Sequence, residues 1–447
     1  MKAFFFAPRF LVLWIALVLP AGLWAQGYSV TFSKAFSPAS IPLGGTTTLS
    51  FTLTGADQGG AFLVSFTDNL PTGLVISSSS LVSNTCSTDT FGATITADTV
   101  ANTVNFSGAD FLYGDSCTFS VNVTGAVAGV YNNTAGPLIC ADCFSGGNTA
   151  SASLTVVGPP TIGKSFGAAS IPVNGSTTLS FTIANPNTSA SLSGIAFSDP
   201  LPGGLAVSAS PGLTSTCVGG SITATGGSGS VSLTGLTLAA SASCTFSVNV
   251  TGSTAGTKSN TTGAISSTEG GTGGTATASL AVLGPPTIGK SFGAAGILVY
   301  GSTSLSFTIT NPNAGASLSG IAFTDPLPGG LAVATPNGLA GSCGGGSITA
   351  TGGSSSVSLT GATLAASASC TFSVSVTSTT AGTKSNTTGA VSSNEGGAGG
   401  TASASLVVQL PTIPVLSPWA LAGLALLLAG LGWVLASLQG QRSRPNV

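Results

Sequence analysis

The chain has 447 residues, of which 4% are charged, and its formal net charge is −2 at pH 7. An average soluble protein has roughly 25% charged residues, and a chain without a basic surface is a poor candidate for nucleic-acid binding. The sequence contains no histidine, which removes the commonest general base and the commonest metal ligand. We therefore expect neither enzymatic activity nor a cofactor. Abundant Val, Leu, Phe and Thr with so little charge is typical of β-sheet rather than of disorder.

Residues 1–25 have the pattern of a secretory signal peptide. Lys2 and Arg9 form a basic start, Phe10–Leu19 is apolar, and Ala25 ends a cleavage site. An uncleaved membrane anchor is the alternative interpretation. The pattern predicts export by the secretory route, with signal peptidase as a processing partner.

A nine-residue stretch, GPPTIGKSF, recurs along the chain and reveals its repeats. It occurs at Gly158–Phe166 and again at Gly284–Phe292, and a weaker form, TFSKAF, occurs at Thr31–Phe36. Self-similarity at a fixed period is the signature of a repeat protein. The spacing predicts three repeats, at 26–157, 158–283 and 284–408.

Each repeat has the pattern of short β-strands. In TLSFTI, Leu179, Phe181 and Ile183 alternate with polar residues, as in a half-buried strand. Turn residues such as DPLPGGL at Asp199–Leu205 separate such runs, and no repeat contains an amphipathic helix. We predict an all-β fold of three tandem immunoglobulin-like antiparallel β-sandwiches, on the order of 100 Å if placed end to end. An all-β solenoid is the alternative, but this repeat is far longer than a solenoid rung.

The repeated stretch also satisfies the P-loop pattern G-x-x-x-x-G-K-[ST]. A working P-loop holds phosphate with backbone N–H groups at the start of a helix. Pro159 and Pro160 supply no N–H there, and neither do their counterparts Pro285 and Pro286. The following residues show no helical period. We interpret the stretch as a joint between domains, stiffened by its two prolines.

Eight cysteines allow 105 pairings, but the repeats reduce that number. Each repeat has one cysteine in its middle and one on a later strand. In an exported protein this recurrence predicts three disulfides within repeats: Cys86–Cys117, Cys217–Cys244 and Cys343–Cys370. Cys140 and Cys143 occur only in the first repeat, as CADC. A local disulfide is favoured there, because no thioredoxin-like or zinc-site pattern surrounds them.

One lysine and one aspartate recur at matched positions in this nearly uncharged chain. Lys34, Lys164 and Lys290 open the repeats, and Asp68, Asp199 and Asp325 follow 34 or 35 residues later. The two residues could pair within each repeat, or they could be separate solvated charges at strand ends. The sequence leaves both alternatives open.

Residues 409–447 form a C-terminal region of different character. Trp419–Leu438 is twenty residues without a charge, and as a helix it would be about 30 Å long, matching a bilayer core. Arg442 and Arg444 follow directly, so we expect the C-terminus to stay cytoplasmic. The stretch predicts a single transmembrane helix, with a buried helix of a soluble protein as the alternative.

The sequence before this helix, IPVLSPWAL, resembles the IPTL-CTERM sorting signal of Gram-negative bacteria. That signal consists of IPTLSxWG, a transmembrane helix and an Arg-rich tail. Val415 and Ala420 depart from it, whereas five residues match: Ile413, Pro414, Leu416, Ser417 and Trp419. The resemblance implies recognition by an exosortase, a membrane protease-transpeptidase, and simple anchoring by the helix is the alternative. Asn-x-Ser/Thr patterns such as the one at Asn386 would be glycosylated only in a eukaryotic secretory route, which this signal argues against.

The repeats resemble tandem Ig-like domains of unknown function on bacterial surface proteins. One motif of those domains reads KSFSPASIPxGGTTTLTFTLTNPN and another FTDxLPxGLxV. The first matches Lys34–Leu53, Lys164–Asn187 and Lys290–Asn313, and the second matches Phe66–Val75, Phe197–Val207 and Phe323–Val333. The resemblance implies a fold and a surface location, but no activity.

These patterns together predict a non-enzymatic protein of the bacterial cell envelope, serving as a spacer, a matrix component or an adhesive stalk. Its expected contacts are the membrane and the sorting machinery, with other surface proteins or glycans as further candidates. The alternative is a binding module in which the divergent first repeat recognises a glycan or a protein. Tyr113 and Tyr131 occur only in that repeat.

Overall fold

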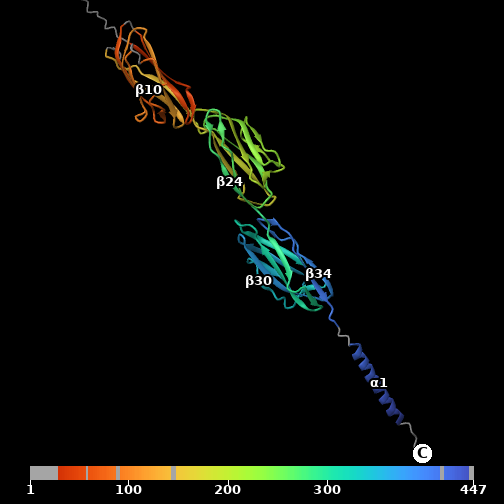
Figure 1. Cartoon of the computed structure of the whole chain (residues 1–447). Helices are drawn as coiled ribbons and strands as arrows, with labels where there is room; N and C mark the ends of the chain where they lie inside the picture. Colours follow the sequence, from red (N-terminus) through yellow and green to blue (C-terminus); the bar gives the residue numbers. More distant parts are fainter. Residues whose placement is uncertain (1–28, 57–58, 87–90, 142–146, 413–416, 442–447) are drawn as a thin grey trace, which may run out of the picture. The chain divides into compact units, whose positions relative to one another are not determined.

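The computed structural model describes residues 29–56, 59–86, 91–141, 147–412 and 417–441 (Figure 1). Each of the three repeats is an all-β unit, and α1 (Pro418–Gln441), the one α-helix among these residues, follows the third. The predicted fold class is confirmed, and the solenoid alternative is wrong. The predicted signal peptide at 1–25 lies outside the described residues.

The first repeat contains three sheets. The largest has the order β1-β3-β9-β5, with β6 also on β9: β1 (Val30–Ser37), β3 (Thr46–Gly55), β9 (Ser116–Gly125), β5 (Leu74–Ile76) and β6 (Ser83–Asn84). The second comprises β4 (Ala61–Asn69), β8 (Thr103–Phe111) and β7 (Thr94–Asp98). The third comprises β10 (Gly129–Ala135), β11 (Ala150–Val157) and β2 (Ser40–Pro42).

The second repeat has the same three-sheet plan with an extended second sheet. Its first sheet comprises β12 (Thr161–Phe166), β14 (Ser176–Ala184), β20 (Ser243–Gly252) and β16 (Leu205–Val207), with β17 (Thr214–Ser215) on β20. Its second comprises β18 (Ser221–Thr223), β19 (Ser230–Leu238), β15 (Leu192–Pro200), β22 (Ser266–Ser267) and β23 (Gly271–Thr272). Its third comprises β13 (Ser170–Pro172), β24 (Thr277–Leu283) and β21 (Gly256–Thr261).

The third repeat reproduces the second strand for strand. Its first sheet comprises β25 (Thr287–Phe292), β27 (Ser302–Thr310), β33 (Ser369–Ser378) and β29 (Leu331–Val333), with β30 (Ala340–Ser342) on β33. Its second comprises β31 (Ser347–Thr349), β32 (Ser356–Leu364), β28 (Leu318–Pro326), β35 (Ser392–Ser393) and β36 (Gly397–Ala398). Its third comprises β26 (Gly296–Leu298), β37 (Ser403–Gln409) and β34 (Gly382–Thr387).

One short parallel pair in each repeat departs from the antiparallel plan. β2 runs parallel to β11, with Ile41 opposite Val156, and β13–β24 and β26–β37 repeat this pairing. The pair brings a strand near the start of each repeat against its last strand. Each repeat is therefore closed on itself.

The core follows from the two-residue period of the strands. Successive side chains of a strand point to opposite faces, and in β3 the residues Leu49, Phe51 and Leu53 are all fully buried. Phe51 lies opposite Phe119 of β9, with ring centroids 4.9 Å apart. Stacked phenylalanine pairs of this kind contribute roughly 0.5–1.5 kcal/mol beyond their burial.

The central phenylalanine of the first repeat provides a test of this core. Phe119 also stacks on Phe106 at 5.6 Å, so we expect Phe119→Ala to lower the free energy of unfolding by about 3–5 kcal/mol through a residual cavity. Denaturant titration followed by peptide-level hydrogen exchange would locate the loss in residues 29–141. The control is Val100→Ala, because Val100 is 96% exposed. An equal effect of both variants would contradict the described core.

Candidate functional site

The first strand of each repeat points a lysine into the core. In β1 the residues Val30, Phe32, Lys34 and Phe36 share the inward face. The Lys34 side chain is 0% exposed, and the same holds for Lys164 and Lys290. A charge at an inward position is unfavourable unless a partner of opposite charge is buried with it.

That partner is an aspartate from the second sheet. Lys34 Nζ donates to both carboxylate oxygens of Asp68, at 2.7 and 2.8 Å, and the aspartate is fully buried. The pairs Lys164–Asp199 and Lys290–Asp325 each have a contact of 2.6 Å. The pairing hypothesis is confirmed, and the alternative of two solvated charges is wrong.

An asparagine from the third sheet completes the cluster. Asn133 Nδ2 of β10 donates to Asp68 Oδ2 at 3.0 Å, and Asn260 and Asn386 make the equivalent bonds at 2.9 Å. These three asparagines are at most 2% exposed. We call the three residues of each repeat the Lys–Asp–Asn cluster. The asparagine was not predicted from the sequence, although an Asn recurs on the equivalent strand of every repeat.

The ion pair of each cluster is buried and lies beside an aromatic ring. Lys34 Nζ is 5.3 Å from the ring centroid of Phe51, and the equivalent distances in the other repeats are 5.5 and 5.6 Å. Burial lowers the pKa of Lys34 below its ordinary value, although the Asp68 carboxylate opposes this shift. Burial lowers the pKa values of Lys164 and Lys290 in the same way. The lysine ammonium therefore loses its proton more readily here than it would on the surface.

In the second and third repeats, one polar atom of this cluster lacks a hydrogen-bond partner. The side-chain carbonyl oxygens Oδ1 of Asn260 and Asn386 are buried and accept no hydrogen bond. A buried acceptor without a donor is destabilising by about 1–3 kcal/mol, so such atoms require an explanation.

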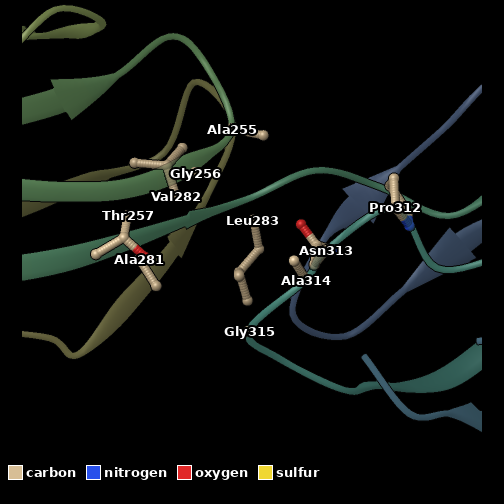
Figure 2. A pocket seen from close by; sticks show the side chains of 10 residues that line it. All are labelled: Ala255, Gly256, Thr257, Ala281, Val282, Leu283, Pro312, Asn313, Ala314 and Gly315. Carbon is tan, nitrogen blue, oxygen red and sulfur yellow. The ribbon is translucent and has the colours of Figure 1, made fainter. Parts of the chain in front are cut away.

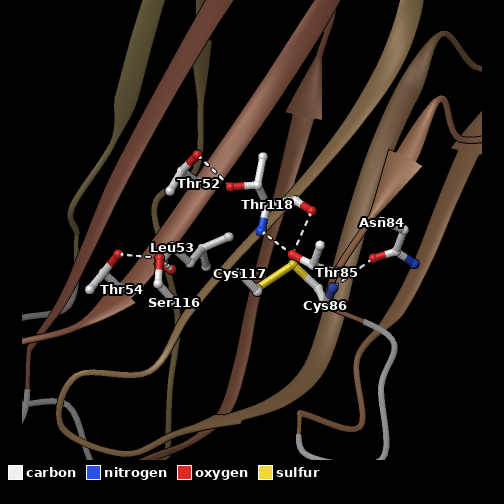
Figure 3. The surroundings of a disulfide bond; sticks show 9 residues. All are labelled: Thr52, Leu53, Thr54, Asn84, Thr85, Cys86, Ser116, Cys117 and Thr118. Atoms are coloured by element: carbon white, nitrogen blue, oxygen red, sulfur yellow. Dashed lines mark hydrogen bonds between the residues drawn. A yellow bond between two sulfur atoms is a disulfide. The ribbon is translucent and has the colours of Figure 1, made fainter.

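Among the described residues, the structure joins three cysteine pairs, each within one repeat: Cys86–Cys117, Cys217–Cys244 and Cys343–Cys370. Their Cα atoms are 5.0 Å apart in every pair, which is within the range of ordinary disulfides. Figure 3 shows that Cys86 follows the short strand β6 and bonds to Cys117 on β9. The bond fastens an edge strand to its own sheet. Cys140 is described, whereas Cys143 lies outside the described residues.

Hydrogen bonds also connect β9 to the segments on both of its sides. Thr118 N donates to Thr85 Oγ1 at 2.8 Å, and Cys86 N donates to Asn84 Oδ1 at 2.8 Å (Figure 3). Thr52 and Thr118 share a hydroxyl–hydroxyl bond of 2.9 Å across β3 and β9. The disulfide and these hydrogen bonds together hold β9 to its neighbouring segments.

The P-loop pattern forms a strand instead of a phosphate-binding loop. Residues Thr161–Phe166 are β12, and Lys164 is committed to Asp199. Gly158 N donates to Asn187 Oδ1 at 2.7 Å, and Asn187 Nδ2 donates back to Gly158 O at 2.8 Å. Gly284 and Asn313 repeat both bonds at 2.7 and 2.8 Å. The backbone at the start of GPPTIGKSF is thus already satisfied, and the nucleotide interpretation is excluded.

A pocket lies around the end of β24, and Figure 2 shows Leu283 and Asn313 beside it. Its lining consists of Ala255, Gly256, Thr257, Ala281, Val282, Leu283, Pro312, Asn313, Ala314 and Gly315. None of these residues is charged, and the Asn313 amide is occupied by Gly284. Within the described residues, no three His, Cys, Asp or Glu side chains gather to hold a metal. We assign no catalytic or metal chemistry to these places.

The C-terminal segment begins with a capped helix. Ser417 precedes α1, and its hydroxyl and carbonyl oxygens accept from Ala420 N at 3.3 and 2.8 Å. Serine before a helix followed by proline at its first position is the preferred start signal. Pro418–Gln439 is long and apolar enough to cross a membrane, with mean hydropathy 2.2, and Trp419 is 87% exposed. The other sorting-signal residues lie outside the described residues: Ile413, Pro414, Leu416, Arg442 and Arg444.

The chain belongs to the family named "Domain of unknown function (DUF7933)". The family model matches three times, at residues 30–156, 160–282 and 286–408. The IPTL-CTERM motif matches residues 412–443. The recognised resemblances, to tandem domains of unknown function and to a C-terminal sorting signal, are both confirmed. No curated protein matches the sequence.

Several solved structures are similar to parts of the chain. The C-terminal domain of the Streptococcus pyogenes antigen I/II-family protein AspA is 12% identical, with a TM-score of 0.36, and the match covers 56% of this chain and 99% of that one. The Escherichia coli adhesin FdeC is 15% identical, with a TM-score of 0.26, over 86% of this chain and 99% of that one. Both TM-scores are below 0.5, so no conclusion about function follows from them.

The buried ion pair makes a clear prediction for the second repeat. Lys164→Met leaves the Asp199 carboxylate buried without its cation, and we expect a loss of about 3–5 kcal/mol in the free energy of unfolding. The double variant Lys164→Met with Asp199→Leu should lose less free energy of unfolding than Lys164→Met alone, because no unpaired charge remains buried. Denaturant titration with peptide-level hydrogen exchange measures both.

The matched control is Lys258→Met in β21. Its ammonium donates to the Thr254 hydroxyl at 2.7 Å, and the residue is as buried as Lys34. Equal losses for Lys164→Met and Lys258→Met would show that the carboxylate plays no special part.

Proposed function

We propose that this DUF7933 protein is a non-enzymatic, exported component of the bacterial cell envelope. In this proposal the three repeats act as a spacer, an adhesive stalk or a matrix component, and α1 anchors or sorts the chain. The observation that carries the proposal is the succession of three closed all-β repeats, a sorting motif and an apolar helix.

The helix supports anchoring because no other described part of the chain covers it. All side chains of α1 from Pro418 to Ala436 are exposed in the structure, and Leu426 is 74% and Leu427 is 66% exposed. An exposed helix that is apolar on every side needs a lipid or protein environment. With Arg442 and Arg444 behind it, we assign the C-terminus to the cytoplasm before any sorting.

The repeats themselves support a structural role rather than catalysis. Their polar clusters are buried, their strand edges carry disulfides, and their backbone joints are hydrogen-bonded. Disulfides of this kind stabilise a small domain against unfolding, which suits a structural role. An exosortase-type protease is the proposed sorting partner.

A second candidate function is ligand binding by the first repeat. Four large apolar side chains are exposed where β4 begins and β8 ends: Phe62, Leu63, Leu112 and Tyr113, at 41–63%. They lie at one end of the sheet, because Ala61 is paired with Phe111. Exposed aromatic and aliphatic groups gathered in one place are typical of recognition surfaces.

The anchoring role is tested by deleting residues 418–441 from the full chain. We expect the protein to move from the membrane fraction to the periplasm or medium, because its only described apolar helix is gone. Fractionation and immunoblotting measure the shift. Replacing α1 by an unrelated membrane helix of equal length is the control, since it restores anchoring but not sorting. Unchanged membrane retention of the deletion would refute the anchor.

The two roles of the first repeat are separated by surface substitution. Leu112→Ser with Tyr113→Ser should abolish attachment to a specific glycan or protein if that surface binds, and should leave attachment unchanged if the repeat is a spacer. Adhesion of cells to a glycan and matrix-protein array measures the difference. Val218→Ser is the control, because Val218 is 86% exposed in the second repeat.

A further inference from the structure

We propose that the Lys–Asp–Asn cluster is a self-modifying site, in which the lysine amine and the asparagine amide of each repeat join into an internal amide cross-link. The bonds would be Lys34–Asn133, Lys164–Asn260 and Lys290–Asn386. The aspartate between them serves as the acid–base group. This inference goes beyond the proposed surface role and does not depend on it.

The nucleophile in this proposal is a lysine held next to its electrophile. Lys34 Nζ and Asn133 Nδ2 both bind the same oxygen, Asp68 Oδ2, at 2.7 and 3.0 Å. An amine becomes a nucleophile only when it is neutral, and burial in an apolar site favours that form. The Phe51 ring at 5.3 Å and the absence of water-accessible surface supply such a site.

The aspartate is placed to move protons between the two reacting groups. In the second repeat Asp199 Oδ1 binds Lys164 Nζ at 2.6 Å, while its Oδ2 binds Asn260 Nδ2 at 2.9 Å. The third repeat has the same arrangement at 2.6 and 2.9 Å. One carboxylate oxygen can thus accept a proton from the ammonium while the other oxygen lies against the asparagine amide. A positioned carboxyl group of this kind is a general acid–base catalyst.

The asparagine carbonyl is the electrophile, and its unsatisfied oxygen fits this role. Oδ1 of Asn260 and of Asn386 is buried without a donor. A half-turn of the amide exchanges Oδ1 and Nδ2, which places the carbonyl oxygen on the aspartate. Once the aspartate carries the lysine proton, it donates to that oxygen and polarises the carbonyl carbon. The same proton transfer therefore frees the amine and activates the amide.

The reaction balances without a further reactant. The lysine ammonium first passes one proton to the aspartate carboxylate, and the Nζ lone pair then attacks Cγ of asparagine to form a tetrahedral intermediate. A second Nζ proton reaches Nδ2 through the aspartate, the Cγ–Nδ2 bond breaks, and ammonia leaves. The product is a secondary amide between Nζ and Cγ. The aspartate retains the proton first released by the ammonium.

The buried site would favour formation of the amide and protect the product from hydrolysis. A group held next to its reaction partner can have an effective concentration of about 10⁵–10⁸ M, so the reaction would need no activating cofactor. Exclusion of water keeps the amide from being hydrolysed. The cross-link would connect the first strand of each repeat with the strand beside its last one, and hence join two different sheets.

Trypsin offers a direct test, because acylated lysine is not cleaved. Between residues 26 and 441 the chain has five lysines and no arginine: Lys34, Lys164, Lys258, Lys290 and Lys384. The full exported chain is purified, reduced, alkylated, unfolded and digested. We expect cleavage at Lys258 and Lys384 and loss of cleavage at the three cluster lysines. The two cleaved lysines are controls within the same molecule.

Mass spectrometry identifies the bond itself. We expect each cluster lysine peptide from a chymotryptic digest to be joined to its asparagine peptide, with the mass of one ammonia missing. Asp199→Asn should restore cleavage at Lys164 alone, while the other two cluster lysines stay protected. A folded wild-type chain that is cut at all five lysines, and whose mass shows no loss of ammonia, would overturn the proposal and leave an ion pair only.

Discussion

The architecture of each repeat depends on one buried aspartate. Asp68 comes from the second sheet, and it is bound by Lys34 from the first sheet and by Asn133 from the third. A carboxylate away from water must be neutralised and hydrogen-bonded, so the three strands cannot slide independently. A shift of one residue would turn any of the three side chains to the outer face. The cluster therefore fixes three registers at once, and the phenylalanine core packs within that frame.

Part of this arrangement could be predicted from the sequence. Charged residues are so rare in the chain that a lysine and an aspartate recurring at matched positions stand out, and a pair was a reasonable hypothesis. The strand pattern of Leu49, Phe51 and Leu53 likewise gave the buried face. The asparagine was hidden, because Asn, Ser and Thr are common throughout and Asn386 also fits a glycosylation pattern. Its contact with Asp325, 61 residues away, depends on sheet pairing that no local pattern encodes.

The joints show the same division between local and long-range information. The prolines of GPPTIGKSF were enough to exclude a phosphate-binding loop, because a missing N–H is a local property. What holds the stretch is Asn187, 29 residues later, whose amide satisfies both backbone groups of Gly158. The start of α1 depends on two neighbouring residues, Ser417 and Pro418. It can therefore be explained from the sequence alone.

The persistence of a buried ion pair in all three repeats calls for a cause other than stability. An apolar set of similar volume is often as stable as a buried pair or more so, and the first repeat differs from the other two at many positions. It nevertheless has the same lysine, aspartate and asparagine. An amide between the lysine and the asparagine would remove the buried ammonium and leave the aspartate as a neutral acid that donates to the new carbonyl. Burial of charge would then be a transient state of folding, and the lasting product would be a covalent tie between sheets.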